Sequence, residues 1–179
     1  MASPACCPQG SWPYMKAPAD YTPQGVVGEL DNKLPVYEVG SGSKAIVVIP
    51  EVFCWEGRLK GICDHFAAKG YYVIMPDIMR GDSINNPENA DKDAYLKKWA
   101  TWSNSEADLA CVFKHVAGKG IKDIGSVGFC WGGWVIFRAS AADFPLKCGA
   151  ICHPSVRLEG YAGSSEVELS RKVKCPIMF

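Results

Sequence analysis

The sequence predicts an α/β protein whose mostly parallel sheet is flanked by helices. Short apolar runs of strand length recur along the chain, and most are apolar throughout, as is typical of strands buried on both faces. Segments in which apolar residues recur at helical spacing alternate with these runs. This alternation places helices against a largely parallel sheet. The 179 residues contain no internal repeat, and their number indicates one domain.

Six segments are predicted to be strands. The earliest precedes a Ser-Gly-Ser turn, and the others carry the continuous apolar character of core strands. In chain order they are "LPVYEVG" (34–40), "AIVVIP" (45–50), "YYVIMP" (71–76), "IGSVGF" (124–129), "CGAIC" (148–152) and "KCPIMF" (174–179).

Three helices are predicted between the core strands. The first spans residues 56–69, which carry one apolar stripe, and Gly70 supplies its C-terminal stop. The second carries the apolar stripe of residues 109–116, and the "SNSE" at 103–106 reads as a capping box a few residues ahead of it. The third helix begins at Trp131.

The chain divides into an N-terminal segment and one domain. Residues 1–24 are rich in Pro, Gly and Tyr and are predicted to run over the surface as coil, whereas residues 25–179 form the α/β domain. Residues 80–105 make a long excursion between a strand and a helix, first polar and then aromatic. Long connections of this kind are often lids or binding loops.

Charge and hydropathy argue against several classes of partner. Acidic and basic residues number 19 each, so no long-range field indicates nucleic acid or a membrane surface. No apolar run approaches the roughly 18 residues of a membrane span. The N-terminus shows neither the basic nor the apolar region of a secretory signal. We therefore expect a cytoplasmic protein.

The nine cysteines are expected to be reduced, because their number is odd and most lie in apolar runs. They are then small core residues. Cys6 and Cys7 are adjacent, which does not match the spacing of a zinc site, so a surface loop is favoured over metal or redox chemistry.

The stretch "SVGFCWGGW" (126–134) is the strongest chemical signal. It places Cys130 where a buried strand turns into a helix, and glycines on both sides allow a tight turn. The spacing G-x-C-x-G-G reproduces a nucleophile elbow with cysteine in place of serine. The following helix N-terminus would favour the thiolate. The alternative is a glycine-rich turn with a buried, inert cysteine.

Glu51 follows the core strand at 45–50, next to where the elbow is expected. A carboxylate at a buried strand end needs a partner. A proton shared between Glu51 and Cys130 is one interpretation. Capping of the following helix by Glu51 is the other.

The motifs "PEVFCWEG", "GYYVIMPDIMRGD" and "GFCWGG" together resemble the dienelactone hydrolases (carboxymethylenebutenolidases) of the α/β-hydrolase superfamily. The resemblance spans roughly residues 25–179. It implies hydrolysis of a small lactone or ester through a thioester acyl-enzyme, with no metal or organic cofactor.

The same resemblance assigns roles to five residues. Cys130 would be the nucleophile, and Glu51 the glutamate that contacts it in the resting enzyme. Backbone N–H groups of Trp131 and Val52 would form the oxyanion hole, and Arg80 would bind a substrate carboxylate.

The triad is incomplete in this sequence. In this fold the acid and then the histidine follow the nucleophile along the chain. After Cys130 the only histidine is His153, which precedes three of the four later acids. We therefore expect that the C-terminal part of the fold is missing after "KCPIMF".

Three other interpretations stay open. They are a rearranged site with His153 as base, a non-catalytic binding fragment, and a thiol-based redox sensor. The sequence does not predict the oligomeric state.

Overall fold

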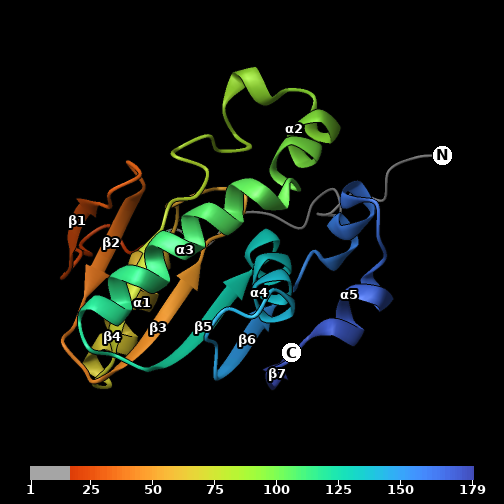
Figure 1. Ribbon diagram of the computed structural model, residues 1–179. Coiled ribbons are helices and arrows are strands. Elements are labelled where there is room, and N and C mark those ends of the chain that lie inside the picture. Colours follow the sequence, from red (N-terminus) through yellow and green to blue (C-terminus); the bar gives the residue numbers. More distant parts are fainter. Residues whose placement is uncertain (1–16) are drawn as a thin grey trace.

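The computed structural model describes residues 17–179, which form one seven-stranded sheet with helices on both faces (Figure 1). The strands lie in the order β1-β2-β4-β3-β5-β6-β7. β1, β2 and β4 pair antiparallel, whereas β4, β3, β5, β6 and β7 pair parallel. The strands are β1 (Val26–Glu29), β2 (Pro35–Val39), β3 (Lys44–Ile49), β4 (Tyr72–Pro76), β5 (Asp123–Phe129), β6 (Cys148–Cys152) and β7 (Ile177–Met178).

Helices cover the two faces of the sheet unequally. α3 and α4 lie on one face, and α1 lies on the other (Figure 1). None of the described helices is long and apolar enough to cross a membrane. The helices are α1 (Leu59–Ala68), η1 (Pro87–Asn89), α2 (Lys92–Trp99), α3 (Trp102–Gly118), α4 (Trp131–Ala141), η2 (Val156–Ala162) and α5 (Glu166–Lys172).

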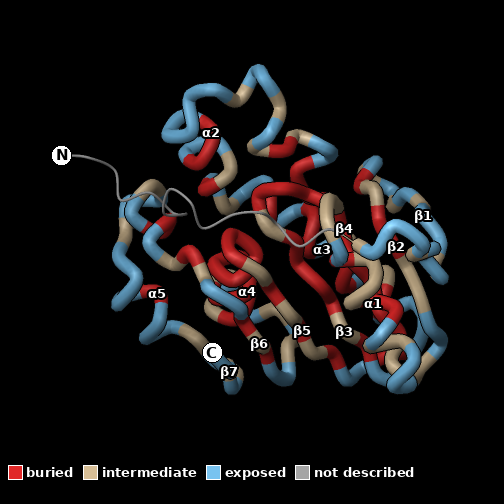
Figure 2. The backbone as a smooth tube through the Cα atoms, turned by 180° about the vertical axis from the view of Figure 1, so that it is seen from behind, coloured by how far each residue is buried: buried red, intermediate tan, exposed pale blue. Residues whose placement is uncertain are grey.

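β3 lies at the centre of the sheet, and its side chains alternate between two apolar clusters. Val47 and Ile49 point into the cluster with α3 and α4, while Val48 points into the cluster with α1. Buried residues accordingly follow the strands through the middle of the molecule (Figure 2). The expectation of a strand apolar on both faces is confirmed.

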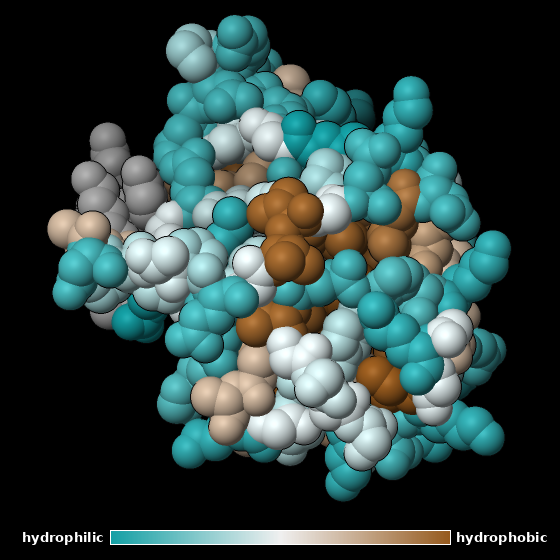
Figure 3. Space-filling view, turned by 90° about the vertical axis from the view of Figure 1, so that its left-hand side faces the viewer, coloured by the Kyte–Doolittle hydropathy of each residue, from teal (hydrophilic) through white to brown (hydrophobic). Residues whose placement is uncertain are grey.

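All six predicted strands are present, but the hairpin strand β1 was not predicted. Val26 and Val27 are 66% and 60% exposed, so β1 carries no buried apolar run. It pairs only with β2, at the edge of the sheet. On this side of the molecule, apolar groups are visible among the polar ones (Figure 3).

The start of α3 corrects the predicted capping box. The helix begins at Trp102 with Thr101 as its N-cap residue, so Ser103 lies inside the first turn. The ring of Trp102 packs edge-to-face on Trp134 of α4 and on Phe144. This aromatic packing accounts for a helix that starts earlier than the capping pattern indicates.

The excursion at residues 80–105 is more regular than predicted, because it contains η1 and α2. The carboxylate of Asp91 accepts hydrogen bonds from the backbone N–H groups of Asp93 and Ala94 and caps α2. The amphipathic pattern of α2 is short and weak, so the sequence does not predict this helix.

The α1 face is only partly covered within residues 17–179. α1 packs over β2, β3 and β4, whereas no described helix lies over β5, β6 and β7 on that face. There the surface is hollowed, with a volume of about 670 Å³ lined mainly by apolar groups. Cys148 and Cys152 are exposed on this side, which corrects the expectation that the cysteines of "CGAIC" are core residues. Cys6 and Cys7 lie outside the described residues.

A buried carboxylate ties the segment before β1 to the domain. Asp64 of α1 accepts hydrogen bonds from the phenol of Tyr21 (2.5 Å), the phenol of Tyr37 and the backbone N–H of Gln24 (3.1 Å). Burial, and then the bond to Asp64, raise the pKa of Tyr37 to about 12. Burial, and then the bond to Asp64, also raise the pKa of Tyr21, so both phenols stay protonated and donate at neutral pH.

Asp64→Asn should lower the free energy of unfolding by about 2 kcal/mol, because one buried acceptor oxygen is replaced by an amide that cannot accept. Urea unfolding followed by circular dichroism measures the change. Asp20→Asn, at an exposed position, is the matched control and should leave stability within about 0.5 kcal/mol. Equal effects of the two substitutions would contradict the assigned role of Asp64.

Candidate active site

Cys130 lies in a tight turn between β5 and α4 and has the backbone conformation of an elbow. Its φ is 50° and its ψ is −112°, in a region that non-glycine residues seldom adopt. Its N–H donates to the carbonyl of Cys152 at 3.0 Å, and its carbonyl accepts from the N–H groups of Gly133 (3.1 Å) and Ser155 (2.9 Å). The neighbouring strand and helix thus hold the strained turn in place.

The three glycines around Cys130 are required by close backbone packing. A Cβ atom at Gly132 would lie 2.3 Å from the carbonyl oxygen of Ile49, and one at Gly128 would lie 2.5 Å from the carbonyl oxygen of Gly132. A Cβ atom at Gly133 would lie 2.7 Å from Cβ of Pro154. The spacing G-x-C-x-G-G is therefore explained by contacts with the end of β3, with α4 and with the turn after β6.

The thiol of Cys130 is buried beside a hydroxyl. Only 1% of Cys130 is exposed, and its Sγ lies 3.2 Å from Oγ of Ser155. Ser155 was not predicted as a site residue. It is the last residue of "ICHPS" (151–155), in the turn that follows β6. Because β6 pairs with β5, the strand that precedes Cys130, the sequence could have indicated a residue of this turn near the thiol.

The ends of β3 and β5 bring Glu51 and Cys130 to the same edge of the sheet. Ile49 pairs with Gly128, so each candidate lies two residues beyond a paired position. α1 begins only at Leu59 with Arg58 as its N-cap residue, and Glu51 therefore does not cap that helix. The capping interpretation of Glu51 is wrong.

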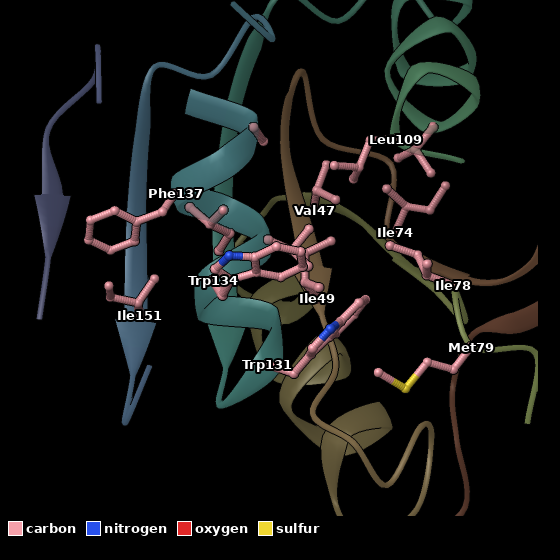
Figure 4. Close-up of a cluster of buried hydrophobic side chains, with 14 of the residues drawn as sticks. Val47, Ile49, Ile74, Ile78, Met79, Leu109, Trp131, Trp134, Phe137 and Ile151 are labelled. Carbon is pink, nitrogen blue, oxygen red and sulfur yellow. The ribbon is translucent and has the colours of Figure 1, made fainter. Parts of the chain in front are cut away.

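The two residues predicted for the oxyanion hole follow these same two strand ends. Val52 is buried, and its carbonyl accepts from the N–H of Ile84 (2.9 Å) and the phenol of Tyr95 (3.1 Å). Trp131 opens α4, and its indole N–H donates to the carbonyl of Trp99 at 2.8 Å. Figure 4 shows Trp131 and Trp134 of α4 among the apolar residues of the sheet, including Ile49. The backbone N–H of Trp131 belongs to the first turn of α4, directly after the thiol.

Arg80 is held by an ion pair. Its guanidinium donates two hydrogen bonds to Asp108 of α3, at 2.8 and 2.9 Å, and a third to the carbonyl of Ile78. The bond to Asp108 raises the pKa of Arg80. The side chain remains 41% exposed, so a cationic edge stays accessible to solvent. Binding of a substrate carboxylate by Arg80 stays a prediction.

Hydrogen bonds to Asp82 hold the segment 80–105, which carries α2, in place close to the thiol. Asp82 accepts from the side chains of Asn89 (2.7 Å), Lys98 (2.7 Å) and Trp99 (2.9 Å). Burial acts to raise the pKa of Asp82, but these hydrogen bonds outweigh it and lower the pKa. Tyr95 of α2 lies at the site, because its phenol donates to the carbonyl of Val52 at 3.1 Å, and burial raises its pKa.

His153 lies at the carboxyl end of β6, one residue after Cys152. It is exposed and has a φ of 41°. His65 is exposed on α1, and His115 in the last turn of α3 contacts Glu38 at 2.8 Å. Neither of these two histidines lies at a carboxyl end of the parallel strands.

Three of the acids that follow Cys130 have structural partners. Glu159 is buried and accepts from Trp134 and Arg138, while Asp143 pairs with Lys174 at 2.5 Å. Glu166 and Glu168 lie in the first turn of α5, and Glu168 accepts from Oγ of Ser164 at 2.8 Å. The expectation that the triad acid follows these residues along the chain stays a prediction.

A strained residue between a central parallel strand and a helix, with glycines on both sides, defines the α/β hydrolases as the class of this fold. Within that class, the chain belongs to the dienelactone hydrolase family, which it matches over residues 35–179.

Two relatives illustrate the similarity. A protein from Zea mays named endo-1,3;1,4-beta-D-glucanase is 32% identical over 132 residues, which are 72% of this chain and 42% of the maize protein. A carboxymethylenebutenolidase homolog from Xenopus tropicalis is 29% identical over 121 residues, 65% of this chain and 49% of that protein. The chain thus spans less than half the length of each relative.

Solved structures show the same fold. A protein from Klebsiella pneumoniae, whose crystal structure is described as that of a dienelactone hydrolase, is 20% identical to this chain. The TM-score of the two structures is 0.67, and the match covers 86% of this chain and 70% of the Klebsiella chain. A cold-adapted esterase from an Arctic intertidal metagenomic library is 19% identical, with a TM-score of 0.60, and the match covers 86% and 67% of the two chains.

Proposed function

We propose that this chain forms the nucleophile-bearing part of a hydrolase that opens lactones or cleaves esters through Cys130. The observation that carries the proposal is the strained conformation of Cys130 at the carboxyl edge of the parallel strands, where α/β proteins bind their ligands. Family membership supports the same reaction class.

The first half of the reaction follows from the residues at this edge. Glu51 accepts the thiol proton, and the thiolate of Cys130 attacks the carbonyl carbon of the ester. The oxyanion of the tetrahedral intermediate accepts hydrogen bonds from the backbone N–H groups of Trp131 and Val52. The C–O bond to the alcohol then breaks, the alkoxide takes the proton that Glu51 accepted from the thiol, and a thioester to Cys130 remains.

The second half requires a general base that activates water against the thioester. In the whole protein we assign this role to the acid and histidine that the family resemblance places after β7 along the chain. His153 is the alternative base, because it lies at the end of β6 beside the elbow. A cationic Arg80 would orient a substrate that carries a carboxylate.

The name of the maize relative denotes a glycosidase, a different chemistry. Glycoside hydrolysis ordinarily uses a pair of carboxyl groups on either side of the scissile bond. The elbow of this chain presents a thiol instead, which attacks acyl carbons readily. The geometry therefore favours ester or lactone substrates.

Incubation with p-nitrophenyl acetate should transfer one acetyl group to Cys130, since acylation needs only the thiol, Glu51 and the oxyanion hole. Intact mass followed by peptide mapping locates the acetyl group. Exposed Cys148 is the internal control and should react much more slowly. Preferential acetylation of Cys148 would overturn the proposal. Labelling of Cys130 without turnover would identify a chain that binds and acylates but does not deacylate.

A redox sensor is the second candidate, and one observation favours it. Cys152 lies next to the elbow, with its carbonyl bonded to the N–H of Cys130. Hydrogen peroxide would oxidise the thiol of Cys130 to a sulfenic acid, and the thiol of Cys152 would displace water to form a disulfide. Peptide mapping after peroxide treatment tests for this disulfide, and its absence would remove this candidate.

A further inference from the structure

We propose that Ser155 is a positioning residue for the nucleophile, which orients the thiol of Cys130 and stabilises its thiolate by donating a hydrogen bond. This inference rests on the proposed function, in which Cys130 attacks as a thiolate. No proton passes to Ser155, which remains a hydroxyl throughout.

Ser155 contacts Cys130 through both its side chain and its backbone. Its Oγ lies 3.2 Å from Sγ of Cys130, and its N–H donates to the carbonyl of Cys130 at 2.9 Å. The N–H of Cys130 in turn donates to the carbonyl of Cys152 at 3.0 Å. The turn 152–155 and the elbow are therefore joined at three points.

The position of Ser155 is set by packing on both of its sides. Before it, Pro154 lies against Gly133, where a Cβ atom would come within 2.7 Å. After it, η2 carries Glu159, which is buried and bound to Arg138 of α4 at 2.7 Å. The hydroxyl is itself buried, so it has little freedom to leave the thiol.

A hydroxyl at this place suits both protonation states of the sulfur. It can accept from the thiol and donate to the thiolate, and a hydrogen bond to the charged form favours that form. The other ionisable groups at this edge are Glu51 and Cys54 after β3, Asp77 and Asp82 after β4, Tyr95 on α2, and Cys152 and His153 at the end of β6. A carboxylate at Glu51 disfavours the thiolate, and the hydrogen bond from Ser155 opposes this effect.

The test is the pH dependence of alkylation of Cys130 by iodoacetamide in the whole 179-residue chain, followed by peptide mapping. Ser155→Ala should move the midpoint of the rate profile upward by about one pH unit, because a hydrogen bond to the thiolate is lost. The profile of exposed Cys148 in the same samples should not change. An unchanged midpoint for Cys130 would overturn the proposal.

A matched pair of variants separates the hydrogen bond from packing. Ser155→Thr and Ser155→Val add the same bulk, but only threonine keeps the hydroxyl. Threonine should retain a midpoint near that of the wild type, and valine should shift it as alanine does. Equal midpoints for the two would also overturn the proposal, even if the alanine variant fails to fold.

Failure of the proposed function would look different. Wild-type protein would then show no acetylation of Cys130 by p-nitrophenyl acetate, while the difference between the threonine and valine variants could still be measured by alkylation.

Discussion

Cys130→Ala should abolish ester and lactone hydrolysis by the whole protein, with a fall in kcat of at least about 10³-fold. Removal of the nucleophile from a catalytic site that acts as a unit costs losses of this order or larger. Alanine is the suitable replacement because it removes only the sulfur and keeps the Cβ atom in a turn with a φ of 50°.

The measurement is the initial rate of p-nitrophenyl acetate hydrolysis and of ring opening of a small lactone. Cys148→Ala, at an exposed position away from the elbow, is the matched control and should keep its activity. Cys130→Ser preserves the geometry and tests whether the thiol itself is needed. Retention of most activity in Cys130→Ala would end the assignment of Cys130 as nucleophile.

Glu159→Ala should lower the free energy of unfolding by about 3 kcal/mol, because it leaves one partner of a buried ion pair without its counter-charge. The carboxylate of Glu159 accepts from Nε1 of Trp134 at 2.9 Å and from Nε of Arg138 at 2.7 Å, and its side chain is 3% exposed. The guanidinium of Arg138 also lies over the rings of Trp102 and Trp134. Because the side chain of Arg138 is partly exposed, the expected loss of stability is at the lower end of the range for buried ion pairs.

Urea unfolding measures this loss. Glu106→Ala on the exposed side of α3 is the control and should change stability by no more than about 0.5 kcal/mol. The double variant with Arg138→Met should cost less than the sum of the single changes, since no charge is then left unpaired. Additive losses would show that the two side chains act independently.

The central part of the fold could be predicted from sequence because its signals are local. β3 and β4 are short apolar runs, and the turn at Cys130 is marked by glycines at which any Cβ atom would come within 2.7 Å of a neighbouring atom. The same stretch identified the candidate nucleophile. Glu51 followed from its place directly after β3.

The contacts that complete the candidate site could not be predicted in this way, because they join distant parts of the chain. Ser155 reaches the thiol only through the register that pairs Phe129 with Cys152. The ion pair of Arg80 with Asp108 depends on how α3 lies over the sheet. β1 escaped prediction for a different reason, since an exposed edge strand carries no continuous apolar run.

The strained turn at Cys130 also links chemistry to folding. Its conformation is held by the turn after β6, and its glycines pack closely against the end of β3, α4 and Pro154. An unfolded or partly assembled chain has none of these constraints, so its cysteine would react as an ordinary thiol. If Cys130 is the nucleophile that we propose, its reactivity would report native molecules, and a titration of that thiol would count the correctly folded fraction of any preparation.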